Sequence, residues 1–199
     1  MVTGFVLAGG QSSRMGRDKA FLPAGARLLI GRVIQRLRPW VDRLVVIGNA
    51  ANIGRLRHLP VDGVLRDIRP GRGPLMGVYT GLMRTTTAVN LFVPCDMPRI
   101  TGRLMERLLN ARRRDAEIVA SLHPVQGLQP FPLVCHRAAC RTIGALLDRG
   151  ERSLQALWRQ PRTQLVRIDE PALWPAFTNI NTVDDYAQLQ QTTTLAPRR

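Results

Sequence analysis

The sequence predicts an α/β fold of three layers, in which a mostly parallel central sheet carries helices on both faces. Two observations lead to this class. Strand-like and helix-like stretches alternate along the chain, and the strand-like stretches are short apolar runs that end in loops. A third observation sets the domain count, because 199 residues with 45% hydrophobic content hold one sizeable core and no linker divides them. We therefore expect a single domain over residues 1–191 and a disordered tail over residues 192–199 (TTTLAPRR).

The first half of the chain contains strand signals around one amphipathic helix. The strand signals are apolar runs rich in β-branched residues, and the second of them ends at the turn-forming pair Gly48-Asn49. The helix signal is LLIGRVIQRL, whose apolar residues repeat with a helical period. The expected ranges are strands at 2–7, 43–47 and 61–65 and a helix at 28–37.

The second half opens with a loop rich in Gly and Pro over residues 67–77, and a helix is expected after it. Two later helices have capping signals at their starts. Thr101 can cap one of them, and Thr182 with Asp185 fits a capping box that starts the last helix. The expected ranges are helices at 78–84, 102–113, parts of 144–159 and from 183 onward, and strands at 90–93, 117–121 and 133–135.

The chain is strongly basic, with 29 Lys and Arg against 14 Asp and Glu and a formal net charge of +15. A nucleic-acid binder is one reading of this charge. Aromatic residues make up only 5% and the cations form no long run, so we favour scattered surface arginines and an anionic small-molecule substrate. Three cysteines without framework spacing indicate reduced thiols in the cytoplasm, and neither a signal peptide nor a membrane span is expected.

The stretch FVLAGGQSSRMGRDK, residues 5–19, holds the first candidate site. Ala8-Gly9-Gly10 directly follows the first strand, and glycines allow backbone N–H groups to approach an anion closely. Arg14 and Lys19 add positive charge, a combination suited to a triphosphate. The stretch matches neither the P-loop nor the GxGxxG pattern, and an ordinary turn with solvated cations is the alternative reading.

Two aspartates follow later strands. Asp96 lies between two prolines in PCDMP, where a stiff loop can direct its carboxylate toward Mg²⁺. Asp67 follows the third strand signal and precedes RPGRGPLMG. Each could equally be a turn or capping residue. In FTNINT, Asn179 and Asn181 can face the same side of an extended segment and offer amide oxygens, although capping of the last helix explains them as well.

These pieces in this order resemble one family. LAGGQSSRMGRDK, GPLMG, PCDMP and FTNINTVDDY are similar to the motifs of the molybdenum cofactor guanylyltransferases, the bacterial MobA family. The resemblance extends from about residue 3 to about residue 190. It implies a Rossmann-like nucleotidyltransferase fold, with Mg²⁺ as cofactor and GTP and molybdopterin as substrates. It also implies transfer of GMP to the molybdopterin phosphate, with release of pyrophosphate. Molybdoenzymes or their chaperones are possible recipients of the product.

The resemblance also implies roles for individual residues. Asp96 would hold the metal together with Asn181, and Arg14, Lys19 and Asp96 would be catalytic. Gln129, Asn179 and Asn181 would lie near the second substrate, where Pro132 departs from the family pattern. Where the family often has Asn or Ser, this chain has Ile47, and Asn49 is the nearest candidate for that guanosine contact. The expected nucleotide-binding residues are Leu7, Ala8, Gly9, Gly10, Lys19, Asn49, Asp67 and Asp96.

Two alternatives remain open from the sequence. One is a related nucleotidyltransferase, which would transfer CMP to the same cofactor or a nucleotide to another phosphorylated small molecule. The other is a non-catalytic nucleotide- or nucleic-acid-binding module, which the positive charge supports.

Overall fold

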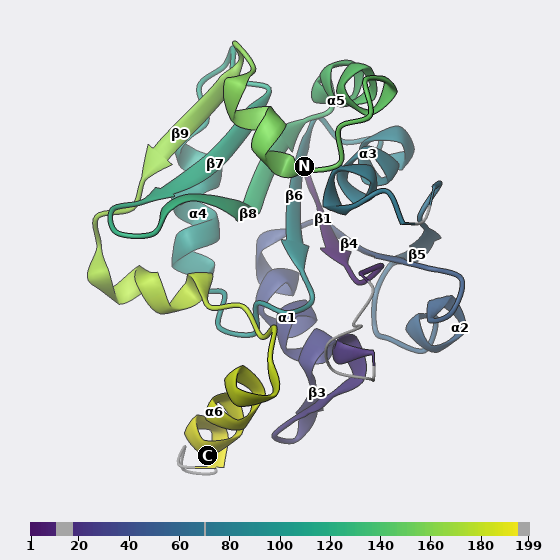
Figure 1. Cartoon of the computed structure of the whole chain (residues 1–199), viewed down its shortest axis with the longest axis vertical. Coiled ribbons are helices and arrows are strands. Elements are labelled where there is room, and N and C mark those ends of the chain that lie inside the picture. Colours follow the sequence, from purple (N-terminus) through teal and green to yellow (C-terminus); the bar gives the residue numbers. More distant parts are fainter. Residues whose placement is uncertain (11–17, 70, 195–199) are drawn as a thin grey trace.

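The computed structural model of the chain describes residues 1–10, 18–69 and 71–194. Its centre is a seven-stranded sheet in the order β5-β4-β1-β6-β8-β7-β9 (Figure 1). Only β8 runs antiparallel to its neighbours β6 and β7 among these strands, so the predicted mostly parallel sheet is confirmed. The strands are β1 (Val2–Leu7), β4 (Arg43–Gly48), β5 (Gly63–Arg66), β6 (Val89–Pro94), β7 (Ile118–His123), β8 (Gly127–His136) and β9 (Thr163–Arg167).

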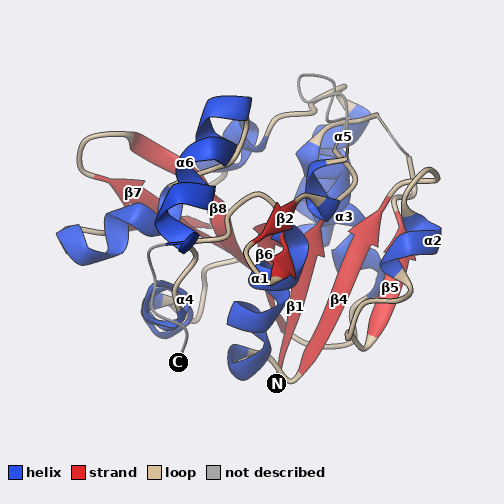
Figure 2. Cartoon of the chain, turned by 90° about the horizontal axis from the view of Figure 1, so that it is seen from below, coloured by secondary structure: helices blue, strands red, loops and turns tan. Residues whose placement is uncertain are grey.

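Helices cover both faces of the sheet, as the alternating pattern predicts (Figure 2). Helices α1 (Leu29–Leu37) and α4 (Gly102–Ala111) lie on one face, while α3 (Pro74–Arg84) and α5 (Ala139–Asp148) pack together on the other. The short helix α2 (Ile53–Leu56) lies beside β5, and α6 (Val183–Thr194) stands at one end of the molecule. The smaller elements are the hairpin β2 (Pro23–Ala24) and β3 (Arg27–Leu28) and the 3-10 turns η1 (Lys19–Phe21), η2 (Arg38–Trp40), η3 (Leu154–Arg159) and η4 (Pro171–Phe177).

The centre of the core lies between β1, β6 and α3. Phe5 of β1 is opposite Phe92 of β6, and their rings stack with centroids 4.9 Å apart and an interplanar angle of 12°. Both side chains are fully buried. Helix α3 approaches this pair at Gly81, where an added Cβ would come within 2.6 Å of the Phe92 ring. A glycine at this position therefore sets the distance between helix and sheet.

Several elements differ from the sequence-based expectation. Strand β8 begins at Gly127 rather than Leu133, because its first half pairs with β7 in a bulged hairpin in spite of its prolines. Helix α3 begins at Pro74 rather than residue 78, and proline at the first helical position is a start signal that the composition of the loop concealed. The edge strand β9 was not predicted.

The C-terminal segment joins the molecule through a second, smaller core. The predicted capping box is present, since Thr182 Oγ1 accepts from Asp185 N at 3.1 Å and Asp185 Oδ2 accepts from Thr182 N at 2.8 Å. Tyr186 of α6 donates from its hydroxyl to Pro23 O of the β2–β3 hairpin at 2.5 Å. Helix α6 continues to Thr194, so residues 192–194, which we expected in the tail, are helical, and residues 195–199 lie outside the described part. The small core consists of Ala24, Leu29, Ile180 and Leu189.

Two glycines within helices should respond in opposite directions to substitution by alanine. Gly81→Ala should lower the free energy of unfolding by about 1–3 kcal/mol, because the new methyl group overlaps the Phe92 ring. Gly31→Ala in α1 should raise it by up to about 1 kcal/mol, because its nearest neighbour is an ordinary 3.8 Å contact and alanine is the better helix former. Urea unfolding of both variants measures the two changes, and a stable Gly81→Ala protein would contradict the tight packing of α3.

Candidate active site

The carboxyl ends of the parallel strands surround a cavity of about 380 Å³. Strands β1, β4, β5 and β6 all end at this edge of the sheet, and the loops that follow them supply most of its wall. The described lining residues are Leu7, Ala8, Gly9, Gly10, Asp18, Lys19, Ile47, Asp67, Gly71, Gly73, Pro74, Gly77, Pro94, Cys95, Asp96 and Phe131. Most of the expected nucleotide-binding residues are therefore in one place.

The first loop leaves β1 with its backbone directed along the cavity wall. Ala8 N donates to Ile47 O at 2.8 Å, which extends the pairing of β1 with β4 by one residue. Within the described residues, the N–H groups of Gly9 and Gly10 have no hydrogen-bond acceptor. Two neighbouring backbone donors at a cavity wall can bind an anion. Arg14, the other cation expected here, lies outside the described residues.

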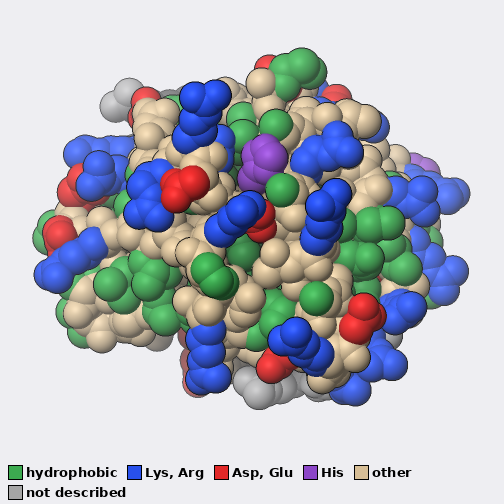
Figure 3. All heavy atoms as spheres, turned by 90° about the horizontal axis from the view of Figure 1, so that it is seen from above, with side chains coloured by type: hydrophobic (Ala, Val, Ile, Leu, Met, Phe, Trp, Pro, Cys, Tyr) green, Lys and Arg blue, Asp and Glu red, His purple; other side chains and the backbone are tan. Residues whose placement is uncertain are grey.

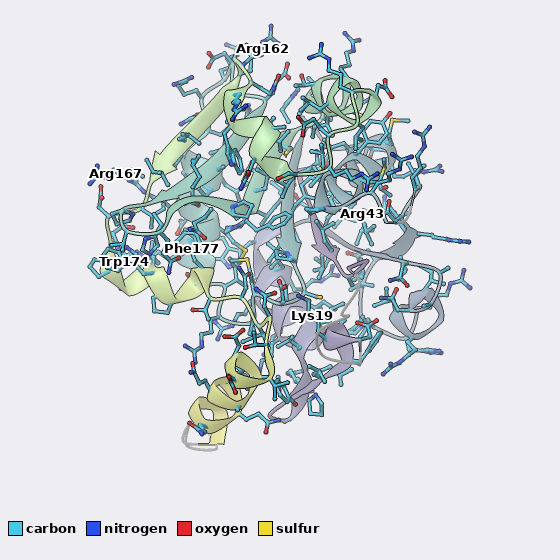
Figure 4. All side chains as sticks on the ribbon, viewed as in Figure 1. Lys19, Arg43, Arg162, Arg167, Trp174 and Phe177 are labelled. Atoms are coloured by element: carbon cyan, nitrogen blue, oxygen red, sulfur yellow. The ribbon has the colours of Figure 1, made fainter. Side chains whose placement is uncertain are left out.

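Lys19, Asp96 and Asn181 meet at one side of the cavity. Lys19 Nζ forms an ion pair with Asp96 Oδ2 and donates to Asn181 Oδ1 at 3.3 Å. Figure 4 shows Lys19 where the N-terminal segment meets the start of α6. The extended segment that carries Asn181 is held to the same loop, because Ile180 N donates to Asp96 O at 2.9 Å. The structure thus joins residues from the beginning, middle and end of the chain.

The side chain of Asp96 suits a hard cation. Asp96 is only 8% exposed, and its Oδ1 is buried without a hydrogen-bond partner among the described residues. The Lys19 ammonium lies between the oxygens of Asp96 and Asn181, so this position already accommodates positive charge. The described residues contain no group of three or more His, Cys, Asp or Glu side chains placed to hold a metal. A Mg²⁺ ion bound by one carboxylate and completed by substrate phosphates and water fits these donors.

Asp67 forms the opposite wall of the cavity, at the end of β5. Asp67 N donates to Gly48 O at 2.8 Å, and Asp67 Oδ1 accepts from the hydroxyl of Thr80 on α3 at 3.0 Å. Burial raises the pKa of the Asp67 carboxyl above its ordinary value, and the hydrogen bond from Thr80 opposes this rise. The carboxylate therefore has one oxygen fixed by α3, and its desolvation favours a ligand that donates hydrogen bonds to it.

Four of the expected site residues in the described part of the chain are not among the residues that line the cavity. Ile47, and not Asn49, lies at its wall, while the Asn49 side chain donates to Gly9 O at 3.3 Å and accepts from the backbone of the next turn. Gln129 donates to Gly127 O within its own hairpin at 3.4 Å. Asn179 and Asn181 do not line it either, although Asn181 accepts a hydrogen bond from the lining residue Lys19.

Sequence reasoning missed several residues that build the site. The N-terminus of α3 faces the cavity through Gly73, Pro74 and Gly77, because this helix begins earlier than predicted. Asn52 is buried behind the first loop and bonds to its backbone, and nothing in the local sequence marks it as different from any helix-start asparagine. The GxGP pattern around Gly73 was the signal that could have placed the helix start.

A second cavity of about 500 Å³ adjoins the first and shares Pro74 and Phe131 with it. Its wall is partly aromatic, and it contains one cation at Arg159. The described lining residues are Pro74, Leu128, Pro130, Phe131, Ser153, Leu154, Gln155, Trp158 and Arg159. The two cavities together give room for two ligands side by side.

On the face seen from above, the positive charge is spread among other residue types (Figure 3). Figure 3 shows Lys and Arg side chains distributed among other residue types on the face seen from above, rather than in one continuous patch. Some of them pair with acids, as Arg162 does with Glu117 and Arg167 with Asp169. All three cysteines are free, and burial raises the pKa of Cys95 and Cys135. Among the described residues, no helix combines the length and apolar character needed to cross a bilayer.

Comparison with known proteins identifies the family. Residues 4–165 match the family described as the MobA-like NTP transferase domain. The chain belongs to this family. It is 34% identical over 189 residues to the molybdenum cofactor guanylyltransferase of Vibrio parahaemolyticus, a match that covers 94% of this chain and 93% of the relative. A probable molybdenum cofactor guanylyltransferase of Bacillus cytotoxicus is 32% identical over 194 residues, covering 94% and 96% of the two chains.

A solved structure has the same fold. The molybdopterin-guanine dinucleotide biosynthesis protein A of Archaeoglobus fulgidus superposes with a TM-score of 0.82 over 96% of this chain and 98% of its own, at 17% identity. At that identity the likeness concerns the fold alone. The family predicted from LAGG, PCDMP and FTNINT, and the nucleotidyltransferase fold expected with it, are thus confirmed.

The raised pKa of Asp67 predicts a pH-dependent difference in stability. A carboxyl whose pKa is higher in the folded state than in the unfolded state opposes folding once it ionises, so its destabilising effect grows as the pH rises through the carboxyl range. Asp67→Asn removes this effect and can keep the Thr80 hydrogen bond. We therefore expect the melting temperature of the variant to exceed that of the original protein at neutral pH, with the difference vanishing in acid.

Asp185→Asn is a control of opposite sign. The backbone N–H of Asn181 holds the pKa of the Asp185 carboxyl below its ordinary value, so the ionised group stabilises the fold above that range and loses this effect as the pH falls. Asp185→Asn should therefore be less stable than the original protein at neutral pH and equally stable in acid. Thermal unfolding of both variants from about pH 3 to about pH 7 measures the two trends. Parallel trends would show that the Asp67 carboxyl is not destabilised by burial.

Proposed function

We propose that this chain transfers GMP from GTP to the terminal phosphate of molybdopterin, forming the guanine dinucleotide of the cofactor and pyrophosphate. Support comes from relatives named molybdenum cofactor guanylyltransferase that match nearly the whole chain. The structural observation that carries the proposal is the meeting of Lys19, Asp96 and the backbone donors of Gly9 and Gly10, which have no acceptor among the described residues, at one cavity. Such a site can bind a triphosphate and counter the charge that develops on it.

In the proposed reaction, the chain acts mainly by position and charge. An oxygen of the acceptor phosphate forms a bond to the α-phosphorus of GTP while the bond to the β-phosphate oxygen breaks, and pyrophosphate leaves. The acceptor phosphate is ionised at neutral pH, so no side chain has to remove a proton from it. The N–H groups of Gly9 and Gly10 donate to phosphate oxygens, and Lys19 neutralises the leaving pyrophosphate. Arg14 is proposed to assist Lys19 from the same loop.

Mg²⁺ is the proposed cofactor, held by Asp96 Oδ1 with the amide oxygen of Asn181 beside it. When bound, the ion would supply positive charge that polarises the phosphates. Lys19 lies beside both of these residues, through its ion pair with Asp96 and its hydrogen bond to Asn181, and would reach the triphosphate from there.

The nucleoside would lie between the first loop, Ile47 and the N-terminus of α3, with Asp67 accepting hydrogen bonds from it. The Asp67 carboxylate lies at the cavity wall, and a carboxylate with its two acceptor oxygens suits paired N–H groups, which guanine presents on one edge. We propose that the acceptor occupies the second cavity, where Trp158 and Phe131 offer aromatic surface to the flat pterin ring. We also propose contacts to this substrate from Asn179, Asn181 and Gln129. We place the reaction in the cytoplasm, with delivery of the product to molybdoenzymes or their chaperones.

A pyrophosphate-release assay tests the proposed activity. The protein is supplied with Mg²⁺, with GTP, CTP, ATP or UTP, and with or without molybdopterin. We expect release with GTP only when molybdopterin is present, with formation of the guanine dinucleotide. Preference for CTP would move the chain to cytidylyl transfer. Absence of release from folded protein that binds GTP would exclude this acceptor.

Two variants should separate the nucleotide side of the site from the acceptor side. Lys19→Ala removes the charge at the triphosphate and should lower kcat by about 10²-fold or more. Trp158→Ala removes aromatic surface in the second cavity and should raise KM for molybdopterin several-fold while KM for GTP stays unchanged. Steady-state kinetics with each substrate varied in turn measure both effects. Equal changes in both KM values for Trp158→Ala would argue against an acceptor site in the second cavity.

A further inference from the structure

Two asparagines lie behind the first loop, on the side away from the cavity. We infer that Asn49 and Asn52 are positioning residues, which turn the peptide groups of the loop so that the N–H groups of Gly9 and Gly10 face the cavity. Asn52 also holds the turn that carries Lys19. This inference rests on the proposed triphosphate site. It explains why the N–H groups of Gly9 and Gly10, which have no side chain to orient them, point to the cavity.

Each asparagine donates a hydrogen bond to one carbonyl of the loop. Asn52 Nδ2 donates to Ala8 O at 2.7 Å, and Asn49 Nδ2 donates to Gly9 O at 3.3 Å. Neither asparagine is among the described residues that line the cavity, whereas Ala8 and Gly9 are. The two carbonyl groups therefore point to the rear of the loop.

The direction of the carbonyls decides the direction of the donors. In a trans peptide, the C=O of one residue and the N–H of the next point in opposite directions. With Ala8 O turned toward Asn52, the N–H of Gly9 points away from Asn52, and the same holds for the N–H of Gly10 opposite Asn49. These are the two donors that lack an acceptor within the described residues. The asparagines thus present the donors of both peptide groups to the cavity.

The amide group of Asn52 is used completely. Besides Ala8 O, its Nδ2 donates to Asp18 Oδ2 at 2.9 Å, and its Oδ1 accepts from Asn49 N at 2.9 Å. Asn52 is 2% exposed, and Gly48 makes room for it, because a Cβ at Gly48 would lie 2.5 Å from Asn52 Oδ1. A buried amide with all these partners has one orientation. If the amide were rotated by 180°, its oxygen would face two other acceptors, Ala8 O and Asp18 Oδ2.

The bond to Asp18 connects this arrangement to Lys19. Asp18 caps η1 by accepting from Ala20 N at 3.0 Å through its other oxygen, and Lys19 is the first residue of that turn. Asn52 therefore holds the loop after β1 and the start of η1 from a single position on the next strand–helix connection. The backbone donors and the lysine are kept at a fixed separation, which suits a ligand that bridges them.

The equilibrium binding of GTP tests this inference without the second substrate. Asn52→Asp has nearly the same shape as the original residue but replaces its donor by an acceptor, and we expect the Kd for GTP to rise roughly tenfold or more. The double variant Asn52→Asp with Asp18→Asn restores the original charge and a donor–acceptor pair between the two side chains. It should recover part of the lost affinity but not all of it, because Ala8 O still lacks its donor.

Asn90→Asp is the matched control for stability. Asn90 is a fully buried asparagine near the start of β6, at the opposite edge of the sheet, where it bonds to Thr87 and Thr85. Asn90→Asp should have a lower melting temperature than the original protein but bind GTP with the same affinity. Asn49→Ser is a second variant, which adds no charge and is used in case Asn52→Asp does not fold. Its hydroxyl can still accept from the backbone of the turn but is too short to reach Gly9 O, so it too should weaken GTP binding.

The outcomes separate the inference from the proposed function. If the original protein binds GTP and both Asn52→Asp, when folded, and Asn49→Ser bind it equally tightly, the inference is wrong and the function stands. If affinity falls as much in Asn90→Asp as in Asn52→Asp, the effect reflects general loss of stability and the inference is again wrong. If the original protein binds no GTP, the proposed function fails and the inference fails with it.

Discussion

The ion pair between Lys19 and Asp96 is the contact on which the arrangement of the site depends. Its two members lie far apart in sequence and on different elements, so it exists only because β1, β6 and η1 are assembled around the same edge of the sheet. Asn181, from the end of the chain, completes the contact. A partly buried ion pair of this kind is not a strong source of stability, since desolvation offsets most of the attraction. Its value lies in keeping opposite charges available where a charged ligand arrives.

The surrounding structure holds this contact in place from three directions. The parallel pairing of β1 with β4 and β6 fixes the loops, and Cys95 N donates to Leu7 O at 3.0 Å to tie two of them together. The small core under α6 connects the hairpin after η1 with the segment that carries Asn181. Asn52 connects the first and second loops. Each of these supports uses groups other than the side chains of Lys19, Asp67 and Asp96, which lie at the cavity wall.

The positive charge of the chain acts in two ways, as an overall field and as a single side chain at the cavity. The excess of Lys and Arg gives a positive field around the molecule, which favours the approach of anionic small molecules, and on the face that Figure 3 shows these side chains form no single continuous patch. Among the described residues that line the first cavity, the cation is Lys19, whose side chain is only 21% exposed and pairs with Asp96. A general field and one directed charge therefore serve different purposes in the same protein.

Residue patterns alone determined the class of fold and the order of most elements, because the periodicity of apolar residues follows from which face of a strand or helix is buried. The motifs LAGG, PCDMP and FTNINT also identified the family and the loops of the site. The sequence did not reveal β9, the full length of β8 or the start of α3, since edge pairing and prolines hide the pattern. Only the tertiary structure decided that Asn49 and Asn52 act behind the loop, that Ile47 lies at the wall and that Gln129 does not. The direction of a side chain depends on contacts between loops, and no local pattern records these contacts.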